Sequence, residues 1–355
     1  MEEPSGSTRR GAWLAVLSAV CFGVTAPLVK IAGHGAGPFA TAALLYLGAA
    51  TFSVFGSWAA KDEAPLRAGH LPRLVAVASL GAVLAPALLA WGLQRTSATS
   101  ASLLLNLEAV FTIVLGRMFY EEPIGRQVAL AVALVTGGSM LVVAGGSGVE
   151  SMSLLGAGAV AAATLGWALD NTLTRPLSDL DPRRVVLAKA GIGSVLSGCV
   201  ALLLGETLPA MPAALALLGL GGIGYGLSLR LYLLAQRRIG AGRTGSIFAL
   251  GPFLGIAVAW ATGERAPGLW MIVPGSMVAL GVYAHVTERH RHRHHHERME
   301  HEHAHRHDDG HHDHAHAQPI IGEHSHLHRH EPMAHEHAHG SDLHHQHRHD
   351  RSTRP

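Results

Sequence analysis

The feature that most constrains this chain is a series of ten apolar runs that ends before Val286. They lie near residues 11–32, 38–59, 72–93, 99–119, 126–145, 154–174, 184–205, 211–234, 244–262 and 268–285. An α-helix rises 1.5 Å per residue, so about 20 residues cross a hydrocarbon core of about 30 Å. The connections are short and rich in Gly, Pro and charge, as loops at the headgroup level are. The series predicts an all-α membrane protein with ten transmembrane helices.

The runs also repeat. Identical residues recur at one constant shift in residue number, the shift that takes position 23 to position 166, and we call it the repeat shift. Seven pairs follow it, namely Gly23/Gly166, Gly48/Gly191, Arg95/Arg238, Ala98/Ala241, Leu107/Leu250, Glu121/Glu264 and Gly138/Gly281. Chance would explain a few Gly pairs, but the Arg and Glu pairs at the same shift argue against it. Each half holds five spans, and five is odd, so the second half enters from the opposite face. The sequence therefore predicts two inverted five-helix repeats, which suit alternating access around a midplane site.

The distribution of Lys and Arg predicts the orientation. With a cytoplasmic N-terminus, the cytoplasmic segments carry Arg9, Arg10, Lys61, Arg67, Arg73, Arg117, Arg126, Arg175, Arg183, Arg184, Arg237, Arg238 and Arg243, and the other side carries Lys30, Arg95 and Arg265. This excess follows the positive-inside rule, so both termini are expected in the cytoplasm. The first run is interpreted as a retained span, because it is long for a cleaved signal peptide and has a counterpart later in the chain.

Part of the first half resembles a known family. The run TSATSASLLLNLEAVFT at residues 96–112, followed by Glu121 and then Gly137-Gly138, resembles the EamA module of the drug/metabolite transporter superfamily. Ala109 stands where that family commonly has Pro, and Tyr120 stands where it commonly has Gly. The resemblance implies a multi-pass permease of the inner membrane. It divides the chain into a cytoplasmic N-terminus (1–10), a first EamA repeat (11–145), a second EamA repeat (154–285) and a tail (286–355).

Glu108, near the middle of the fourth run, is the leading candidate for a functional residue. An acidic side chain at that depth costs roughly 2.5–3.5 kcal/mol to insert, so it is expected to face protein or a wet cavity. It could exchange a proton or attract a cationic group; the alternative is a buried neutral acid bonded to a neighbouring helix. Asn106 lies about 200° away around the helix and cannot share its face. The repeat places Gly251 opposite Glu108, so only one half offers this carboxyl.

Further cavity candidates come from the second half. Asp170 and Asn171 lie near the cytoplasmic end of the sixth run, and Arg230 lies in the eighth. Arg230 is open to three interpretations, namely binding an anionic substrate, pairing with Asp170, or reaching the headgroups. For Lys189 we favour reaching the headgroups. Trp167 is a candidate for lining the path, with packing or interfacial anchoring as the alternative.

The tail has a composition of its own, since 24 of the 27 histidines lie beyond His285. Many alternate with other residues, and these are the predicted metal ligands: His301, His303, His305, His307, His324, His326, His328, His330, His335, His337 and His339. Little apolar material is present to build a core, so we expect disorder. Neutral imidazole binds Ni, Zn, Co and Cu, so the tail predicts metal binding by composition. The alternative is a dispensable solvated tail.

These features favour a secondary transporter that exports a small metabolite, with a divalent metal (Ni/Co/Zn) exporter as the second hypothesis and a non-transporting metal sensor as the third. The export direction and the metabolite class are implied by the resemblance. An enzyme is disfavoured, because no nucleophile–base pairing is visible in the spans. We expect no required cofactor, and as partners the lipid bilayer, a small-molecule substrate and divalent metal ions, but no nucleic acid. The protein is expected to be a monomer or a homodimer.

Overall fold

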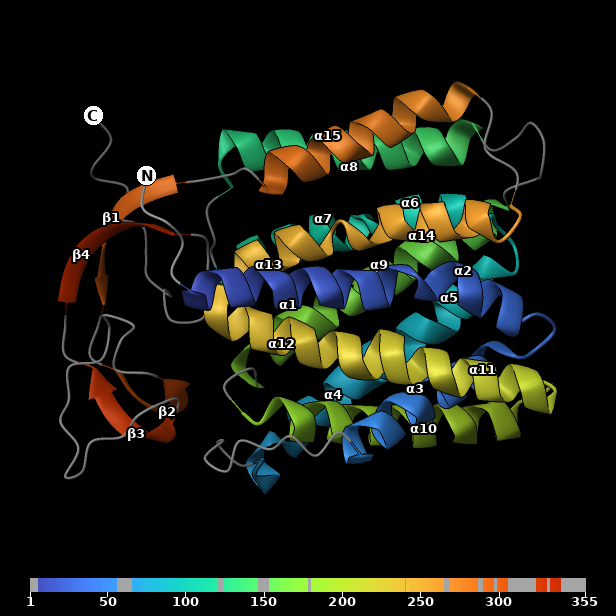
Figure 1. The fold of residues 1–355 in the computed structure, drawn as a ribbon, viewed down its shortest axis with the longest axis horizontal. Helices are drawn as coiled ribbons and strands as arrows, with labels where there is room; N and C mark the ends of the chain where they lie inside the picture. Colours follow the sequence, from blue (N-terminus) through green and yellow to red (C-terminus); the bar gives the residue numbers. More distant parts are fainter. Residues whose placement is uncertain are drawn as a thin grey trace.

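The apolar part of the chain forms a bundle of roughly parallel helices in the computed structural model (Figure 1). The structure describes residues 6–55, 66–120, 124–145, 153–177, 180–239, 241–264, 269–286, 290–296, 299–305, 324–330 and 333–339. The first half contains α1 (Gly6–Gly23), α2 (Thr25–Ala32), α3 (Pro38–Phe55), η1 (Ala68–His70), α4 (Leu71–Ala78), η2 (Ser79–Leu84), α5 (Ala85–Leu93), α6 (Ala98–Leu105), α7 (Leu107–Tyr120) and α8 (Arg126–Gly145). The second half contains α9 (Leu154–Thr174), η3 (Arg175–Leu177), α10 (Pro182–Leu203), α11 (Met211–Gly221), η4 (Gly222–Leu227), α12 (Ser228–Ile239), α13 (Ala241–Phe248), α14 (Gly251–Ala261), η5 (Leu269–Met271) and α15 (Ile272–Val286).

Several of the apolar runs are interrupted, and the interruptions recur at the repeat shift. The two π-helical segments, η2 and η4, are counterparts at both their first and their last residues. The break between α6 and α7 falls at Asn106, and the break between α13 and α14 falls at Ala249 and Leu250. A π-helical turn leaves a backbone carbonyl without its usual partner, and such turns are frequent at functional sites.

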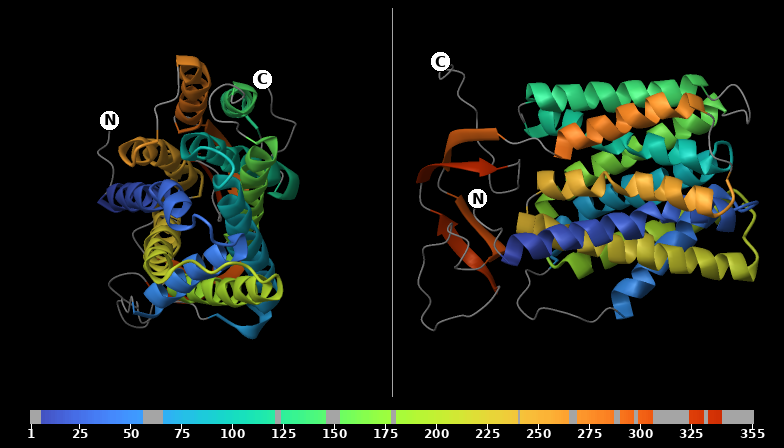
Figure 2. Two further views of the ribbon diagram at one scale, coloured as in Figure 1. Left: turned by 90° about the vertical axis from the view of Figure 1, so that its right-hand side faces the viewer. Right: turned by 45° about the horizontal axis from the view of Figure 1, so that its top comes forward.

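Helix packing follows the same relation. Helix α1 packs along α12, and α9, its counterpart at the repeat shift, packs along α5, the counterpart of α12. Two further pairs join counterparts directly, α3 with α10 and α8 with α15 (Figures 1 and 2). The two halves therefore interlock through equivalent surfaces. Helix α1 begins and α15 ends at the same end of the bundle (Figure 1).

Glycine allows other helices of the bundle to approach closely. A Cβ added to Gly221 of α11 would lie 1.9 Å from the carbonyl oxygen of Leu45 of α3, and one added to Gly23 of α1 would lie 2.2 Å from that of Gly251. Any larger residue at either position would force the backbones apart. Small residues at membrane helix interfaces have this effect, because dispersion contacts drive helix association in lipid.

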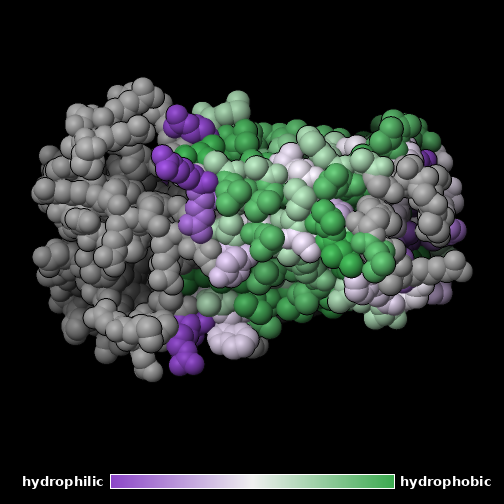
Figure 3. Space-filling view, turned by 90° about the horizontal axis from the view of Figure 1, so that it is seen from above, coloured by the Kyte–Doolittle hydropathy of each residue, from purple (hydrophilic) through white to green (hydrophobic). Residues whose placement is uncertain are grey.

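The outer surface of the bundle is suited to lipid. Hydrophobic residues cover its middle, and hydrophilic residues gather towards the ends (Figure 3). Six helical stretches in the described part of the chain are long and apolar enough to cross a membrane, and three shorter apolar helices accompany them. Large apolar side chains such as Leu202 and Leu203 are exposed on this surface. The 21-residue α9 is not among these helices, since Asp170 and Asn171 lower its mean hydropathy.

The tail contains four strands where the composition predicted disorder. They are β1 (His290–His296), β2 (Met299–His305), β3 (His324–His330) and β4 (Met333–His339). Strand β1 pairs antiparallel with β4, and β2 pairs antiparallel with β3. The alternation of His with other residues has a period of two, which matches the pleat of a strand, and we attribute the difference from the prediction to it.

Candidate functional site

Helices from both halves of the chain, together with the π-helical segment η4, line a cavity within the bundle. The volume of the cavity that the centre of a water molecule can occupy is about 60 Å³, which is enough for several waters or for the head group of a ligand. Its lining comprises Phe22, Tyr46, Glu108, Trp167, Asp170, Asn171, Lys189, Gly224, Tyr225, Ser228, Leu229, Tyr232 and Phe248. The cavity therefore combines charged groups with an unusual number of aromatic rings. Four of the six cavity candidates from the sequence, Glu108, Trp167, Asp170 and Asn171, lie together here.

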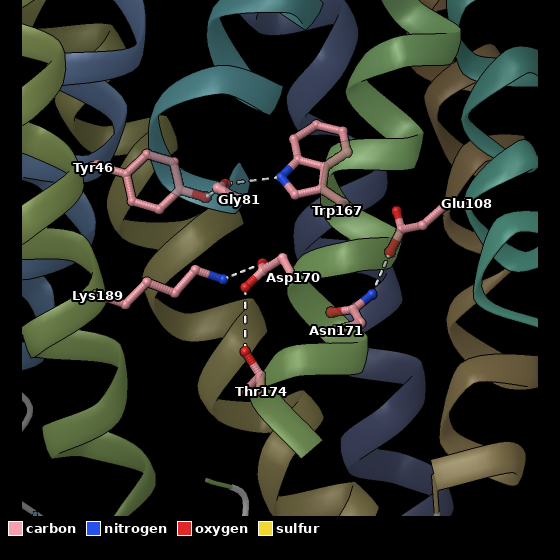
Figure 4. Close-up of polar contacts among 8 residues, drawn as sticks. All are labelled: Tyr46, Gly81, Glu108, Trp167, Asp170, Asn171, Thr174 and Lys189. Carbon is pink, nitrogen blue, oxygen red and sulfur yellow. Dashed lines mark hydrogen bonds and ion pairs between the residues drawn. The ribbon is translucent and has the colours of Figure 1, made fainter. Parts of the chain in front are cut away.

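Glu108 reaches the cavity from the first turn of α7. The break at Asn106 starts a new helix at this depth, and the peptide dipoles of a helix start stabilise a carboxylate. The side-chain amide of Asn171 donates a hydrogen bond to Glu108 Oε1 at 2.7 Å (Figure 4). No Lys, Arg or His of the described residues forms an ion pair with Glu108. Glu108 is thus held by a neutral amide, without a paired cation in this part of the chain.

Asp170, by contrast, is fully engaged. Its carboxylate forms an ion pair with the ammonium of Lys189 and accepts a hydrogen bond of 3.2 Å from Thr174 Oγ1 (Figure 4). Asp170 and Lys189 are 2% and 4% exposed. The expectation that Lys189 reaches the headgroups is therefore wrong, because a buried carboxylate on the facing helix holds it inside. Arg230 is likewise not the partner of Asp170.

A third set of contacts joins one wall of the cavity to η2. The hydroxyl of Tyr46 and the indole Nε1 of Trp167 both donate to the carbonyl oxygen of Gly81, at 2.6 and 3.0 Å (Figure 4). The N–H of Ala85 donates to the carbonyl of Leu80, and Pro86 has no N–H, so the carbonyl of Gly81 is left for these two side chains. A Cβ on Gly81 would lie 2.1 Å from Asp170 Oδ2, so only glycine fits here. Tyr46, Trp167 and the Asp170–Lys189 pair therefore converge on one residue.

Aromatic rings complete the lining. Phe22 contacts Trp167, Tyr225 and Phe248 with ring centroids 5.7, 6.0 and 5.1 Å apart. Tyr232 contacts Phe248 at 5.2 Å, and Tyr46 contacts Tyr225 at 5.3 Å. The rings form one continuous network from α1, α3, α9, η4, α12 and α13. Phe, Trp and Tyr make up only 5% of the chain, so this clustering is local.

Two predicted candidates lie elsewhere. Asn106 is buried at the α6–α7 break, where its amide donates to the carbonyl of Leu103 at 3.3 Å, and its Oδ1 has no hydrogen-bond partner among the described residues. Arg230 is half-buried on α12 and does not line the cavity. The face of α12 that does line it carries Ser228, Leu229 and Tyr232. Asn106 and Glu108 thus point to different surroundings, as their angular separation requires.

Apart from Trp167, the aromatic lining was missed from the sequence, although a signal for part of it exists. At the repeat shift, Tyr225, Tyr232 and Phe248 correspond to Ala82, Leu89 and Leu105. Positions where one half has an aromatic and the other an aliphatic residue mark where the two halves differ in chemistry. The same comparison pairs Glu108 with Gly251.

No group of three or more His, Cys, Asp or Glu side chains that could hold a metal ion occurs among the residues whose side chains the structure describes. His307 and the side chains of the other predicted tail ligands lie outside the described residues. The divalent metal exporter thus gains no support here, and metal binding by the tail stays a prediction.

Comparison with known proteins finds a family match in the first half. Residues 9–144 match the EamA-like transporter family. An uncharacterized transporter from Methanothermobacter thermautotrophicus is 27% identical over 305 residues, which cover 79% of this chain and 88% of that protein. A crystal structure with 18% identity superposes with a TM-score of 0.57 over 79% of this chain and 96% of the other, a likeness that concerns the fold alone. The resemblance found in the sequence is confirmed, and the chain is a multi-pass membrane protein.

Proposed function

We propose that this chain, whose residues 9–144 belong to the EamA-like transporter family, is a secondary transporter that exports a small metabolite by alternating access. The observation that carries this proposal is the cavity around Glu108. It lies inside a membrane-embedded bundle and holds an acidic side chain that no described cation neutralises. A carboxylate in such a place is costly unless a proton or a cationic ligand neutralises it during transport.

We further propose ten spans arranged as two inverted repeats. The support comes from the breaks and π-helical segments that recur at the repeat shift, and from the packing of counterpart helices against each other. The excess of Lys and Arg favours a cytoplasmic location for both termini in the inner membrane. In that orientation helices α1, α10 and α13 begin on the cytoplasmic side, and helices α7, α9 and α12 end there.

With this orientation the cavity extends from Glu108, near the middle of its span, into the cytoplasmic half of the bundle. Asp170 is four residues from the end of α9, and Lys189 is seven residues from the start of α10. Tyr232 is seven residues from the end of α12, and Phe248 is seven residues from the start of α13. At 1.5 Å per residue these distances are about 6 to 11 Å along the helix. A ligand would therefore enter from the cytoplasm.

The repeat relation also indicates the outward path. The counterparts of Tyr225, Ser228, Tyr232 and Phe248 are Ala82, Ala85, Leu89 and Leu105, all buried in the main apolar core. If the halves exchange conformations, these four residues become part of the lining of a cavity that opens on the other side. The four carry no charge and no aromatic ring, and Glu108 is replaced there by Gly251. Tyr46 and Lys189, by contrast, are each other's counterparts and would line both cavities. A ligand held by the cytoplasmic cavity would meet weaker contacts on the way out, which favours release outside.

The test uses the full-length protein in liposomes loaded with a defined mixture of amino acids, amines and nucleosides. An imposed pH gradient drives efflux, and mass spectrometry follows the external medium. We expect at least one compound to leave faster than from protein-free liposomes, and its dependence on the gradient to be lost in Glu108→Gln. Release no faster than the blank would contradict the transporter. Unaltered pH dependence in Glu108→Gln would remove Glu108 as the coupling residue.

A further inference from the structure

We infer that the cavity binds an organic ammonium cation, with Glu108 as its counter-charge and the surrounding aromatic rings as its cage. The inference rests on the proposed function and gives it a substrate class. It is carried by a juxtaposition inside one cavity, that of a carboxylate unpaired among the described residues with six aromatic side chains.

When Glu108 is ionised, the described side chains that line the cavity carry one more negative charge than positive charge. Lys189 and Asp170 neutralise each other in a buried ion pair. Glu108 receives a hydrogen bond from the neutral Asn171 and forms no ion pair with any described cation. Among the residues that the structure describes, the lining contains no Arg or His, and its only Lys is Lys189. With Glu108 ionised this lining carries one net negative charge, which a single positive charge on the ligand would balance.

The rings supply the second element of recognition. A cation within about 6 Å of an aromatic centroid is attracted by the negative face of the ring, which strengthens as the cation is desolvated. Phe22 lies 5.1–6.0 Å from Trp167, Tyr225 and Phe248, measured between ring centroids. Phe22 meets Trp167 and Tyr225 edge to face, so these rings form one cluster, and an ammonium group in the cavity that they line lies beside several of them. An apolar body attached to it finds more aromatic surface.

Other ligand classes fit less well. An anion would meet Glu108 and would have to displace Asp170 from Lys189. A neutral ligand would leave an ionised Glu108 without a counter-charge in a water-poor site, which is costly. A zwitterionic amino acid carries a carboxylate as well, and the described lining has no free cation to accept it.

The same geometry makes a proton and the ammonium cation competitors for Glu108. A protonated Glu108 has no charge to offer, so amine binding should strengthen as the pH rises until the carboxyl is fully ionised. The titratable groups that share the cavity with it are Asp170, Lys189, Tyr46, Tyr225 and Tyr232. Asp170 and Lys189 are tied to each other, so Glu108 is the group that we expect to govern this dependence.

The experiment measures equilibrium binding to the purified full-length protein by the change in tryptophan fluorescence, to which Trp167 in the cavity contributes, and, as an independent readout, by calorimetry. Four probes share one apolar body and differ in charge: 2-phenylethylamine, the neutral 2-phenylethanol, zwitterionic phenylalanine and anionic 3-phenylpropionate. We expect the amine to bind at least tenfold more tightly than each of the other three, and its affinity to rise with pH.

Variants then separate the contribution of the Glu108 charge from that of the aromatic rings. Glu108→Gln keeps a carbonyl oxygen for Asn171 but removes the charge, and it should abolish the preference for the amine over the alcohol. Phe248→Leu should weaken amine binding severalfold, whereas Phe119→Leu, on an exposed face of α7, should leave it unchanged. Each variant is checked for a wild-type melting temperature. If Glu108→Gln unfolds it is replaced by Glu108→Ala, which also removes the charge, and if Phe248→Leu unfolds it is replaced by Phe22→Leu.

The outcomes are distinct. Tighter binding of phenylalanine or phenylpropionate, or an amine affinity unchanged in Glu108→Gln, overturns the inference while leaving the transporter proposal to the liposome assay. Amine binding without flux from liposomes supports the inference and counts against the transporter.

Discussion

Lys189 of α10 and Asp170 of α9 form an ion pair at a depth where both side chains are almost fully excluded from solvent. In that position each group needs the other, because an isolated charge in the bundle would be neither hydrated nor paired. The pair also links α9 to α10 beside Gly81 of η2, which packs on both helices, and Trp167 and Asn171 lie on the same helix as Asp170.

The first prediction concerns this pair. Lys189→Met should destabilise the protein by about 3–5 kcal/mol, because it leaves the Asp170 carboxylate buried and unpaired. Asp170→Asn combined with Lys189→Met should recover most of that loss. Reversible unfolding in mixed micelles measures both, with Lys30→Met at the end of α2 as the control. A double variant as unstable as the sum of its singles would show that the pair contributes no coupling.

The second prediction concerns the fit of Gly81. Gly81→Ala places a methyl group 2.1 Å from Asp170 Oδ2 and should cost about 1–3 kcal/mol through forced repacking. Gly158→Ala, on α9 with nothing within 4 Å of the added Cβ, should be neutral or slightly stabilising. The melting temperatures of the two variants in detergent, each compared with the wild type, test this prediction. Equal effects of the two substitutions would mean that Gly81 is not the contact that limits this wall.

The third prediction concerns orientation. His34 lies in the loop after α2, Ala68 lies in η1 before α4, and both are exposed. In the proposed orientation His34 is on the outer side of the membrane and Ala68 is on the cytoplasmic side. In a background without Cys21 and Cys199, a membrane-impermeant maleimide should label His34→Cys in intact cells. It should label Ala68→Cys only after permeabilisation. The reverse pattern would invert the whole assignment of entry and exit.

Much of the fold was predictable, because a membrane span leaves a long apolar run and the repeat leaves identical residues at a fixed shift. The breaks within spans were not. The residues of η2 and η4 are mostly apolar like the rest of their runs, so composition does not show that the regular backbone hydrogen bonds change there.

The site was predictable in part for a related reason. Glu108, Asp170 and Asn171 stand out because polar groups are expensive in lipid. Lys189 stood out too, but reaching the headgroups and pairing inside give the same sequence signal, and only the facing Asp170 distinguishes them. The rings of Tyr46, Tyr225 and Phe248 are not costly in lipid in this way, so only the comparison of the two halves singles out Tyr225 and Phe248.

The central claim is that the two halves exchange conformations, and Leu89 and Tyr232 test it most directly because they are counterparts at the repeat shift. In liposomes of known orientation, Leu89→Cys is labelled from the outside and Tyr232→Cys from the inside, with the buried Val142→Cys as the control. The account predicts that an imposed pH gradient raises labelling at one of the two positions as it lowers labelling at the other, while Val142→Cys stays protected. Leu89→Cys remaining unlabelled under every gradient, or the two positions changing in the same direction, would contradict it.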